Sequence, residues 1–443
     1  MQHHSGQCSR INRGYRAGRI AEIVFTALLT IVYPAAGAEP KGWLDPVFQE
    51  YPFEQWLNGP DQIAIKWSVK ATPARLSPQQ RLVSFIQVQL DGAELAKRRG
   101  RGEVLILVEI TDSQGLRYQN HSEIDLRKVE EGLKSSNVMY TQSAFVLPGD
   151  YRVAIAIYDS ATKEHATRRT SLRVPPMKSD PLPASWQGLP PVEIIGPEEG
   201  AAGWYLPDVR GQLNLSLQPK RPLRIELIAN LTGSDREAAS LRMQDRNMRL
   251  VIPALKIFSQ MALTNATLNV RLLDLSHRKV AWRQNDAHGL DWDDMKQALT
   301  GSETGKIDVK SLEHRHQQAA FFVSEVGRAI RGSGCAVIIL ANPTVFESGQ
   351  DLSPIRPPEE PTCPVYYFRF YAEPEGPRMV PDEPMYRHRG MGRGPREGIP
   401  QPSPRGFDEL EGTLKPLSPR LYDLHNPEQF RKALASLLAE LGT

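Results

Sequence analysis

The residues whose types could support catalysis do not combine into a reactive arrangement. His314 and His316 are two positions apart on a predicted helix, so their side chains point in different directions and cannot hold one metal ion together. The acids of 291–294 could form an acid/base pair, but they stand at a predicted helix start, where acids cap N–H groups and favour the dipole. The chain has no Gly-x-Ser-x-Gly elbow, no phosphate-binding Gly-rich loop and no His-Glu-x-x-His. We therefore expect a non-catalytic protein without a cofactor.

The first 38 residues have the order of an export signal. Four arginines precede an apolar run and a small-residue site comes after it: Arg10, Arg13, Arg16, Arg19, then 20–32, then Ala36-Gly37-Ala38. This order suits signal peptidase, and the apolar run is shorter than the about 20 residues that a membrane-spanning helix needs. We predict a signal peptide over 1–38 and a secreted or periplasmic protein with no membrane span after cleavage. An uncleaved anchor is the alternative, because Glu22 interrupts the run.

Removal of the signal changes both the charge and the cysteine count. It takes four of the 54 basic residues and one of the 51 acidic ones, which leaves 50 of each. A neutral chain is not attracted as a whole to nucleic acid, so we expect an unknown protein partner and no nucleic acid. Cys8 is also lost. Cys335 and Cys363 remain, and in an oxidising compartment they could form a disulfide or stay as separate buried thiols.

The region before residue 176 predicts an arm and an all-β domain. Residues 39–60 are rich in Pro and aromatic residues and predict an arm whose rings pack on the domain after it. Residues 61–175 contain runs of alternating apolar and polar residues, at 63–69, 82–90, 104–110, 138–147, 151–158 and 167–174. Such runs, separated by turns, predict an Ig-like β-sandwich of about seven strands. Tyr151 is either a corner tyrosine, whose hydroxyl binds a neighbouring loop, or an ordinary strand residue.

The remainder predicts a linker and an α/β domain. Residues 176–222 are dense in Pro and Gly and predict a linker, with short strands at 192–195 and 213–217 that could pack on either neighbour. Apolar strands then alternate with helices, which predicts a doubly wound, mostly parallel, Rossmann-like sheet over 223–443. The predicted elements are strand 223–229, helix 248–263, hairpin 268–275 with 280–282, helices from 291 and over 312–331, strands 336–341, 365–370 and 421–424, and helix 427–441. Residues 373–406 predict a disordered loop.

This order of elements resembles a von Willebrand factor A domain over residues 223–441. Both halves of the chain are also similar to exported proteins of Acidobacteria-type bacteria, in which a β-sandwich precedes an A-type domain. The resemblance implies a metal-ion-dependent adhesion site at the carboxyl ends of the strands, where open α/β sheets bind their ligands. In the family pattern, Asp-x-Ser-x-Ser follows the first strand, a threonine comes from a later loop, and an Asp follows the fourth strand.

The metal carboxylates of that pattern are replaced here. The first strand ends in Asn230-Leu231-Thr232-Gly233-Ser234, the fourth ends in Asn342, and Thr300 or Thr304 could supply the threonine. Mg²⁺ binds proteins through at least one or two carboxylates. We therefore predict no tightly bound metal, and a degenerate, metal-independent contact site formed by Asn230, Thr232, Ser234, Thr304 and Asn342. Two alternatives stay open: residues 230–234 are only a helix-capping turn, or Asp235 restores a carboxylate by a register shift.

The resemblance also places Cys335 and Cys363 at the amino ends of adjacent parallel strands, opposite the ligand edge. A disulfide there would close a loop of about 28 residues and be structural, because no Cys-x-x-Cys is present. The leading hypothesis is a non-catalytic exported protein that mediates protein–protein interaction in the cell envelope or exterior. The alternatives are a metal-dependent adhesion module and an envelope enzyme with an unrecognised site. The sequence indicates neither the partner nor the oligomeric state.

Overall fold

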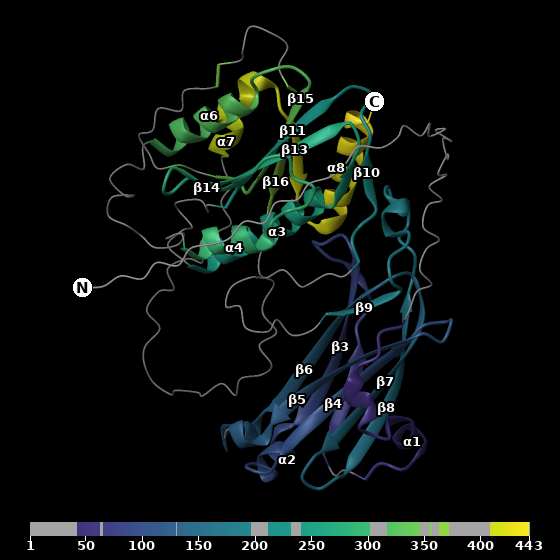
Figure 1. Ribbon diagram of the computed structural model, residues 1–443. Helices are drawn as coiled ribbons and strands as arrows, with labels where there is room; N and C mark the ends of the chain where they lie inside the picture. Colours follow the sequence, from purple (N-terminus) through teal and green to yellow (C-terminus); the bar gives the residue numbers. More distant parts are fainter. Residues whose placement is uncertain are drawn as a thin grey trace, which may run out of the picture. The chain divides into compact units, whose positions relative to one another are not determined.

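The chain contains an all-β part followed by an α/β part (Figure 1). A computed structural model describes residues 42–62, 65–129, 131–195, 211–231, 241–301, 317–344, 346, 355–356, 363–371 and 408–442. The predicted signal peptide (1–38) and the predicted disordered loop (373–406) lie outside these residues. Residues Pro40–Thr443 cluster as one unit. The mixed class predicted from the sequence, all-β plus α/β, is confirmed at this level.

Two antiparallel sheets make up the β part. One has the order β5-β4-β7-β8 and the other the order β1-β3-β6-β9, with β2 paired to β3. Alternate residues of the two sheets, such as Ile86 and Val88 of β3 and Ile106 and Val108 of β4, share one buried core. The strands are β1 (Trp67–Ala71), β2 (Arg75–Leu76), β3 (Leu82–Asp91), β4 (Glu103–Thr111), β5 (Arg117–Asp125), β6 (Asn137–Val146), β7 (Gly149–Asp159), β8 (His165–Val174) and β9 (Val192–Ile195), with helices α2 (Gly92–Lys97), η2 (Leu126–Lys128) and η3 (Glu131–Ser135) between them.

The arm before the first strand packs on this part through its aromatic rings. It forms η1 (Pro46–Gln49) and α1 (Phe53–Asn58), and Phe48, Phe53 and Trp56 share a buried cluster with residues of β4 and β7. The Trp56 ring stacks on Tyr158, with centroids 5.1 Å apart, and on His165, at 4.8 Å. Burial of these rings accounts for the density of aromatic residues in the arm.

Tyr151 acts as a corner tyrosine. Its hydroxyl donates to the Leu147 carbonyl at 2.8 Å and lies 3.2 Å from the Pro191 carbonyl. Burial raises the pKa of Tyr151 to about 12. The hydroxyl thereby connects the turn before β7 to the chain entering β9.

The predicted linker contributes strands to both parts. β9 pairs with β6 and so belongs to a sandwich sheet, after the short helix η4 (Pro183–Trp186). β10 (Leu215–Leu217) pairs in parallel with β12 (Met261–Leu263). The prediction of a helix over 248–263 was wrong at its end, because α3 (Leu241–Ser259) stops before this pairing.

A six-stranded sheet forms the α/β part. Its strand order is β14-β13-β11-β15-β16-β17, and every neighbouring pair is parallel except β13 with the edge strand β14. The bounds are β11 (Leu223–Asn230), β13 (Ala266–Asp274), β14 (Lys279–Gln284), β15 (Cys335–Ala341), β16 (Val365–Phe370) and β17 (Arg420–Leu424). β15 is buried and apolar along its whole length, as a strand covered by helices on both sides must be. β11 and β16 are also largely buried, but each carries a buried charged residue, Glu226 in β11 and Arg369 in β16.

Helices cover both faces of this sheet (Figure 1). Residues of α3, α4 (Trp292–Gly301) and α8 (Pro427–Leu441) share one core with the sheet, and residues of α6 (Gln318–Ala329) and α7 (Glu409–Leu414) share another. A short helix, η6 (Lys415–Leu417), follows α7. Among the described residues, no helix has the length and apolar character needed to cross a membrane.

Candidate functional site at the carboxyl edge of the parallel sheet

The strand order creates a switch point between β11 and β15. From β11 the chain proceeds to β13 on one side, and it later returns to β15 on the other side. Open α/β sheets bind ligands at such a point, outside the carboxyl ends of the strands. β11 ends at Asn230, and Asn342 directly follows β15. The two amides that the sequence singled out therefore lie at neighbouring strand ends.

A threonine that the sequence did not single out lies between these amides. The Asn230 side-chain N–H is 3.4 Å from the Thr344 hydroxyl, which donates to the Asn342 carbonyl at 3.0 Å. All three residues are buried. The Asn342 Oδ1 atom is also buried and has no hydrogen-bond partner in the described part of the chain. Thr232, Ser234 and Thr304, the other predicted contact residues, lie outside the described residues, as does Asp235.

A carboxylate reaches the same edge from a different element. Asp408 caps the start of α7, and its Oδ1 accepts the backbone N–H groups of Thr344 (3.1 Å) and Leu410 (3.2 Å). Its Oδ2 accepts the Tyr367 hydroxyl (2.9 Å) and lies 3.4 Å from Arg369 Nη1. Burial raises the pKa of Asp408, although these hydrogen bonds and the charge of Arg369 oppose that rise. In total, four donors contact the Asp408 carboxylate: two backbone N–H groups, one hydroxyl and one guanidinium.

Arg369, on β16, connects the buried Asp408 to carboxylates that are exposed to solvent. It contacts Asp423 of β17 (Nε to Oδ1, 2.7 Å) and Glu411 of α7, in addition to Asp408. Burial alone would lower the pKa of Arg369, but the hydrogen bonds to Asp423 and Glu411 raise it. Asp423 and Glu411 are 50% and 43% exposed, so this end of the chain of contacts reaches the surface.

Two rings continue the same edge beyond Arg369. The Arg369 guanidinium lies 5.6 Å from the Tyr371 ring centre, and Tyr371 stacks on His425 with ring centres 4.3 Å apart. Tyr371 directly follows β16 and His425 directly follows β17. The edge thus runs from buried amides at the centre of the sheet to carboxylates and stacked rings at its side.

Asp408 carried one signal that sequence reasoning overlooked. An Asp followed by acids in the next turn is typical of a helix start, which Asp408, Glu409 and Glu411 form. Residue 408 lies two positions beyond the predicted disordered loop, and no pattern there indicates which strands it would meet. The sequence did not indicate Thr344 or Tyr367 either, because their hydroxyl groups form hydrogen bonds in the buried interior.

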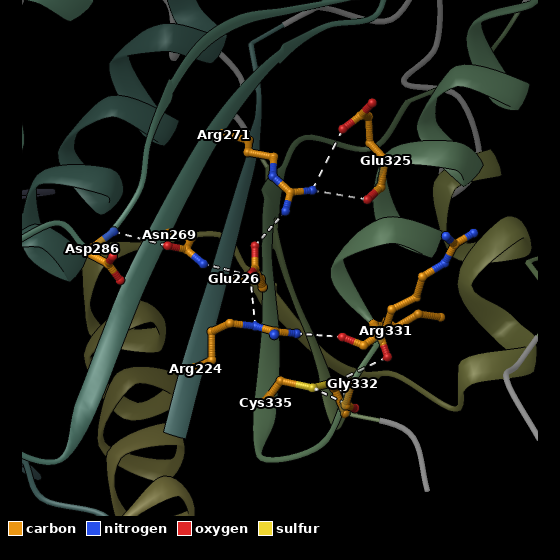
Figure 2. A network of polar contacts seen from close by, with 11 residues as sticks. Arg224, Glu226, Asn269, Arg271, Asp286, Glu325, Arg331, Gly332 and Cys335 are labelled. Carbon is orange, nitrogen blue, oxygen red and sulfur yellow. Dashed lines mark hydrogen bonds and ion pairs between the residues drawn. A yellow bond between two sulfur atoms is a disulfide. The ribbon is translucent and has the colours of Figure 1, made fainter. Parts of the chain in front are cut away.

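A second polar network lies under α6, away from this edge (Figure 2). Glu226 of β11 is buried and contacts Arg224 (3.0 Å), Arg271 (2.8 Å) and the Asn269 amide (2.8 Å). Arg271 also lies 3.7 Å from Glu325 of α6. These contacts join β11, β13 and α6, and no reactive hydroxyl or thiol takes part in them. We interpret the network as structural.

A disulfide joins Cys335, the first residue of β15, to Cys363, just before β16, with Cα atoms 5.0 Å apart. The predicted pairing is therefore confirmed. Cys335 Sγ lies 3.4 Å from the Gly332 carbonyl, in the loop after α6 (Figure 2). The Arg224 Nη2 atom donates to the neighbouring Arg331 carbonyl at 2.6 Å. The amino end of the sheet is thus fastened by a covalent bond and by the charge network together.

Carboxylate–imidazole pairs occur in both parts of the chain. His277 Nδ1 lies 2.7 Å from Asp274 at the end of β13, and His121 Nδ1 lies 2.6 Å from Asp45 in the arm. A catalytic pair of this kind needs a nucleophile on the second ring nitrogen. Among the described residues, the buried Nε2 atom of His277 has no hydrogen-bond partner, and Asp274 also accepts the His277 backbone N–H at 3.1 Å. This pair closes the β13–β14 turn.

Comparisons with known proteins do not assign a family. No family model and no curated protein matches the chain. Two crystal structures of a glycosyl hydrolase family 2 member from Bacteroides cellulosilyticus align with 70% and 69% of the chain, at 7% and 9% identity and TM-scores of 0.17. The chain spans 42% and 37% of their lengths. A siderophore utilization protein from T. fusca aligns at 12% identity over 67% of this chain and 98% of its own, with a TM-score of 0.10. Scores this low carry no argument about fold or function.

Proposed function

We propose that the chain is a non-catalytic exported protein that binds another protein through the carboxyl edge of its six-stranded sheet. The observation that carries this is the composition of the edge: amides end the two strands at the switch point, and the nearby carboxylate of Asp408 is occupied by four donors. The strand order, with one antiparallel edge strand, supports a von Willebrand factor A-like domain for residues 223–441. An Ig-like sandwich is proposed for the β part.

The chemistry of this edge supports binding that does not depend on a metal ion. Mg²⁺ requires carboxylate or similarly hard oxygen ligands with free lone pairs. Asn230 and Asn342 supply neutral amides, and Asp408 has committed its lone pairs to backbone, tyrosine and arginine donors. Among the described residues, no group of three or more His, Cys, Asp and Glu side chains is arranged to hold a metal.

The exposed end of the edge indicates what kind of protein surface would fit. Among the described residues of this edge, the exposed carboxylates of Glu411 and Asp423 and the buried carboxylate of Asp408 surround a single arginine, so the described part of the edge carries more negative than positive charge. Exposed complementary charges increase the association rate and the specificity of protein complexes. A basic surface is therefore the expected partner. A disulfide also suits a compartment outside the reducing cytosol, which supports export.

The test combines metal titration with partner capture from an envelope extract. We expect calorimetry with Mg²⁺ and Mn²⁺ to show no micromolar binding, and a captured partner to remain bound in the presence of chelator. The double variant Glu411→Lys/Asp423→Lys should lose the partner. Asp150→Lys, at an exposed position of β7, is the matched control and should retain it. Tight metal binding, or chelator-sensitive capture, would instead support a metal-dependent adhesion module.

A further inference from the structure

Arg81 is a buried cation, and hydrogen-bond acceptors from the described residues contact only one of its three side-chain nitrogen atoms. It is 1% exposed, and its Nη1 lies 3.2 Å from Glu193 Oε2 and 3.1 Å from the Gly211 carbonyl. Its Nε and Nη2 atoms are buried and have no hydrogen-bond partner among the described residues. A buried guanidinium with unmet donors is unfavourable, because those N–H groups lose water without gaining an acceptor. An acceptor placed beside Nε and Nη2 would remove this cost.

A small cavity lies beside this side chain. Its polar wall is formed by Arg81 with Gln79, Lys256 and Gln260, and its apolar wall includes Leu213 and Ile257. None of the described residues that line it is acidic. The space suits one occupant about the size of a water molecule or a halide ion. α3 contributes one wall at Pro253, where a helix lacks one backbone N–H.

We propose that this cavity is a binding site for one small monatomic anion of the halide class, held by Nε and Nη2 of Arg81. An anion supplies the acceptor that both donors lack, since a halide accepts from several N–H groups at once. The positive charge of Lys256 in the wall favours an anion over a neutral water molecule. The amides of Gln79 and Gln260 can donate to the same occupant.

Negative charges near Arg81 limit the affinity of the cavity for an anion. Glu193 lies on the other side of the guanidinium, and the carboxyl end of α3 carries a partial negative charge; both weaken anion binding. We therefore expect a dissociation constant in the millimolar range. A ligand present at about 30 times its dissociation constant should raise the melting temperature of a chain of this size by about 2 °C.

The experiment is thermal unfolding of the purified chain at constant ionic strength, with sodium gluconate replaced stepwise by sodium chloride or bromide. We expect a saturable rise in melting temperature that gluconate does not produce. Lys256→Met should weaken this response, and Arg81→Met should abolish it. Arg127→Met, which removes an exposed arginine paired with Asp125, is the control and should respond like the parent chain.

A second measurement covers the case in which Arg81→Met does not fold. Crystals grown in bromide should show an anomalous scattering peak beside Arg81 Nε and Nη2, and the peak should be weaker in Lys256→Met. A peak there confirms the site independently of stability. Melting curves that coincide in chloride and gluconate, or density of a water molecule without anomalous signal, would overturn the proposal.

Discussion

Arg431, on the last helix, forms a two-point ion pair with Asp180, 251 residues earlier in the chain. The Arg431 Nε atom lies 2.6 Å from Asp180 Oδ1, and Nη2 lies 2.9 Å from Oδ2. Nη2 also donates to the Leu182 carbonyl and to the Ser185 hydroxyl, each at 2.8 Å. The guanidinium stacks 4.4 Å from the Trp186 ring centre. α8 is thereby held against the segment that the sequence predicted to be a Pro/Gly-rich linker.

Replacement of Arg431 should therefore be strongly destabilising. Arg431 is 1% exposed, and Arg431→Met would leave the mostly buried Asp180 carboxylate, whose side chain is 9% exposed, without its partner, at a cost of about 3–5 kcal/mol. Arg431→Lys should recover only part of this, because an ammonium cannot make the planar two-point contact. Urea unfolding measures both. Arg420→Met, which breaks an exposed pair with Glu440, is the control and should change stability by less than about 1 kcal/mol.

The same pair should make stability depend on pH in the acid range. Burial alone would raise the pKa of Asp180, but hydrogen bonds from Arg431 and the Leu182 amide, with the charge of Arg431, lower it. A lowered folded pKa adds stability that is complete above the unfolded pKa of about 3.9 and is lost as pH falls through the folded value. The free energy of unfolding, measured with urea, should therefore fall more steeply below about pH 5 in the parent chain than in Asp180→Asn. Parallel pH profiles would contradict this assignment.

The periodic alternation of apolar and polar residues in the sequence predicted those strands in which buried residues recur regularly. β3, β4 and β7 alternate buried and less buried residues or are apolar throughout, and all three were expected. β5 was missed because its sequence is polar. Gln119 hydrogen-bonds to Glu109 of the paired strand β4, and Asn120 and Ser122 hydrogen-bond to side chains of β6 in the other sheet, instead of packing on apolar residues. No single-sequence pattern reveals such pairing, since each partner lies in another strand.

The disulfide should stabilise the amino end of the sheet. It closes a separation of 28 residues, which corresponds to about 3–4 kcal/mol on the chain-entropy account. Cys335→Ala/Cys363→Ala, or unfolding in the presence of reductant, should lower the unfolding free energy by this amount. The chain without residues 1–38 should show no free thiol after denaturation without reductant. Detection of two thiols per chain would contradict the pairing.

The candidate site was predictable only in part, for a related reason. A strand end is visible as the point where an apolar run stops, so Asn230 and Asn342 could be placed at the carboxyl edge. Asp408 could not, because its partners Thr344 and Tyr367 are 64 and 41 residues away and no period connects them. Contacts between residues that are far apart in the sequence produce no local sequence pattern that could predict them.

Asp408 should organise the carboxyl edge. Asp408→Ala removes the acceptor of the Thr344 and Leu410 amides and leaves Arg369 with two carboxylates, so we expect a larger loss than in Tyr367→Phe, which removes one buried hydroxyl at about 1–3 kcal/mol. Hydrogen exchange should accelerate at the Thr344 and Leu410 amides in Asp408→Ala. The Val108 amide, in the centre of β4, should be unaffected in the same spectra. Equal exchange at all three would show that Asp408 does not hold this edge.

Glu226 should be coupled to Arg271 through the network under α6. Glu226 is 5% exposed at its side chain, and Glu226→Gln would leave Arg224 and Arg271 facing each other without the carboxylate between them, at about 3–5 kcal/mol. Glu54→Gln, which breaks an exposed pair with Arg117, is the matched control and should cost less than about 1 kcal/mol. A double-mutant cycle of Glu226→Gln with Arg271→Met measures this coupling directly. The second substitution removes a charge that the first has left unpaired. The loss of unfolding free energy in the double variant should therefore be smaller than the sum of the two single losses by about 0.5–3 kcal/mol. Strict additivity would mean that the two side chains stabilise the sheet independently.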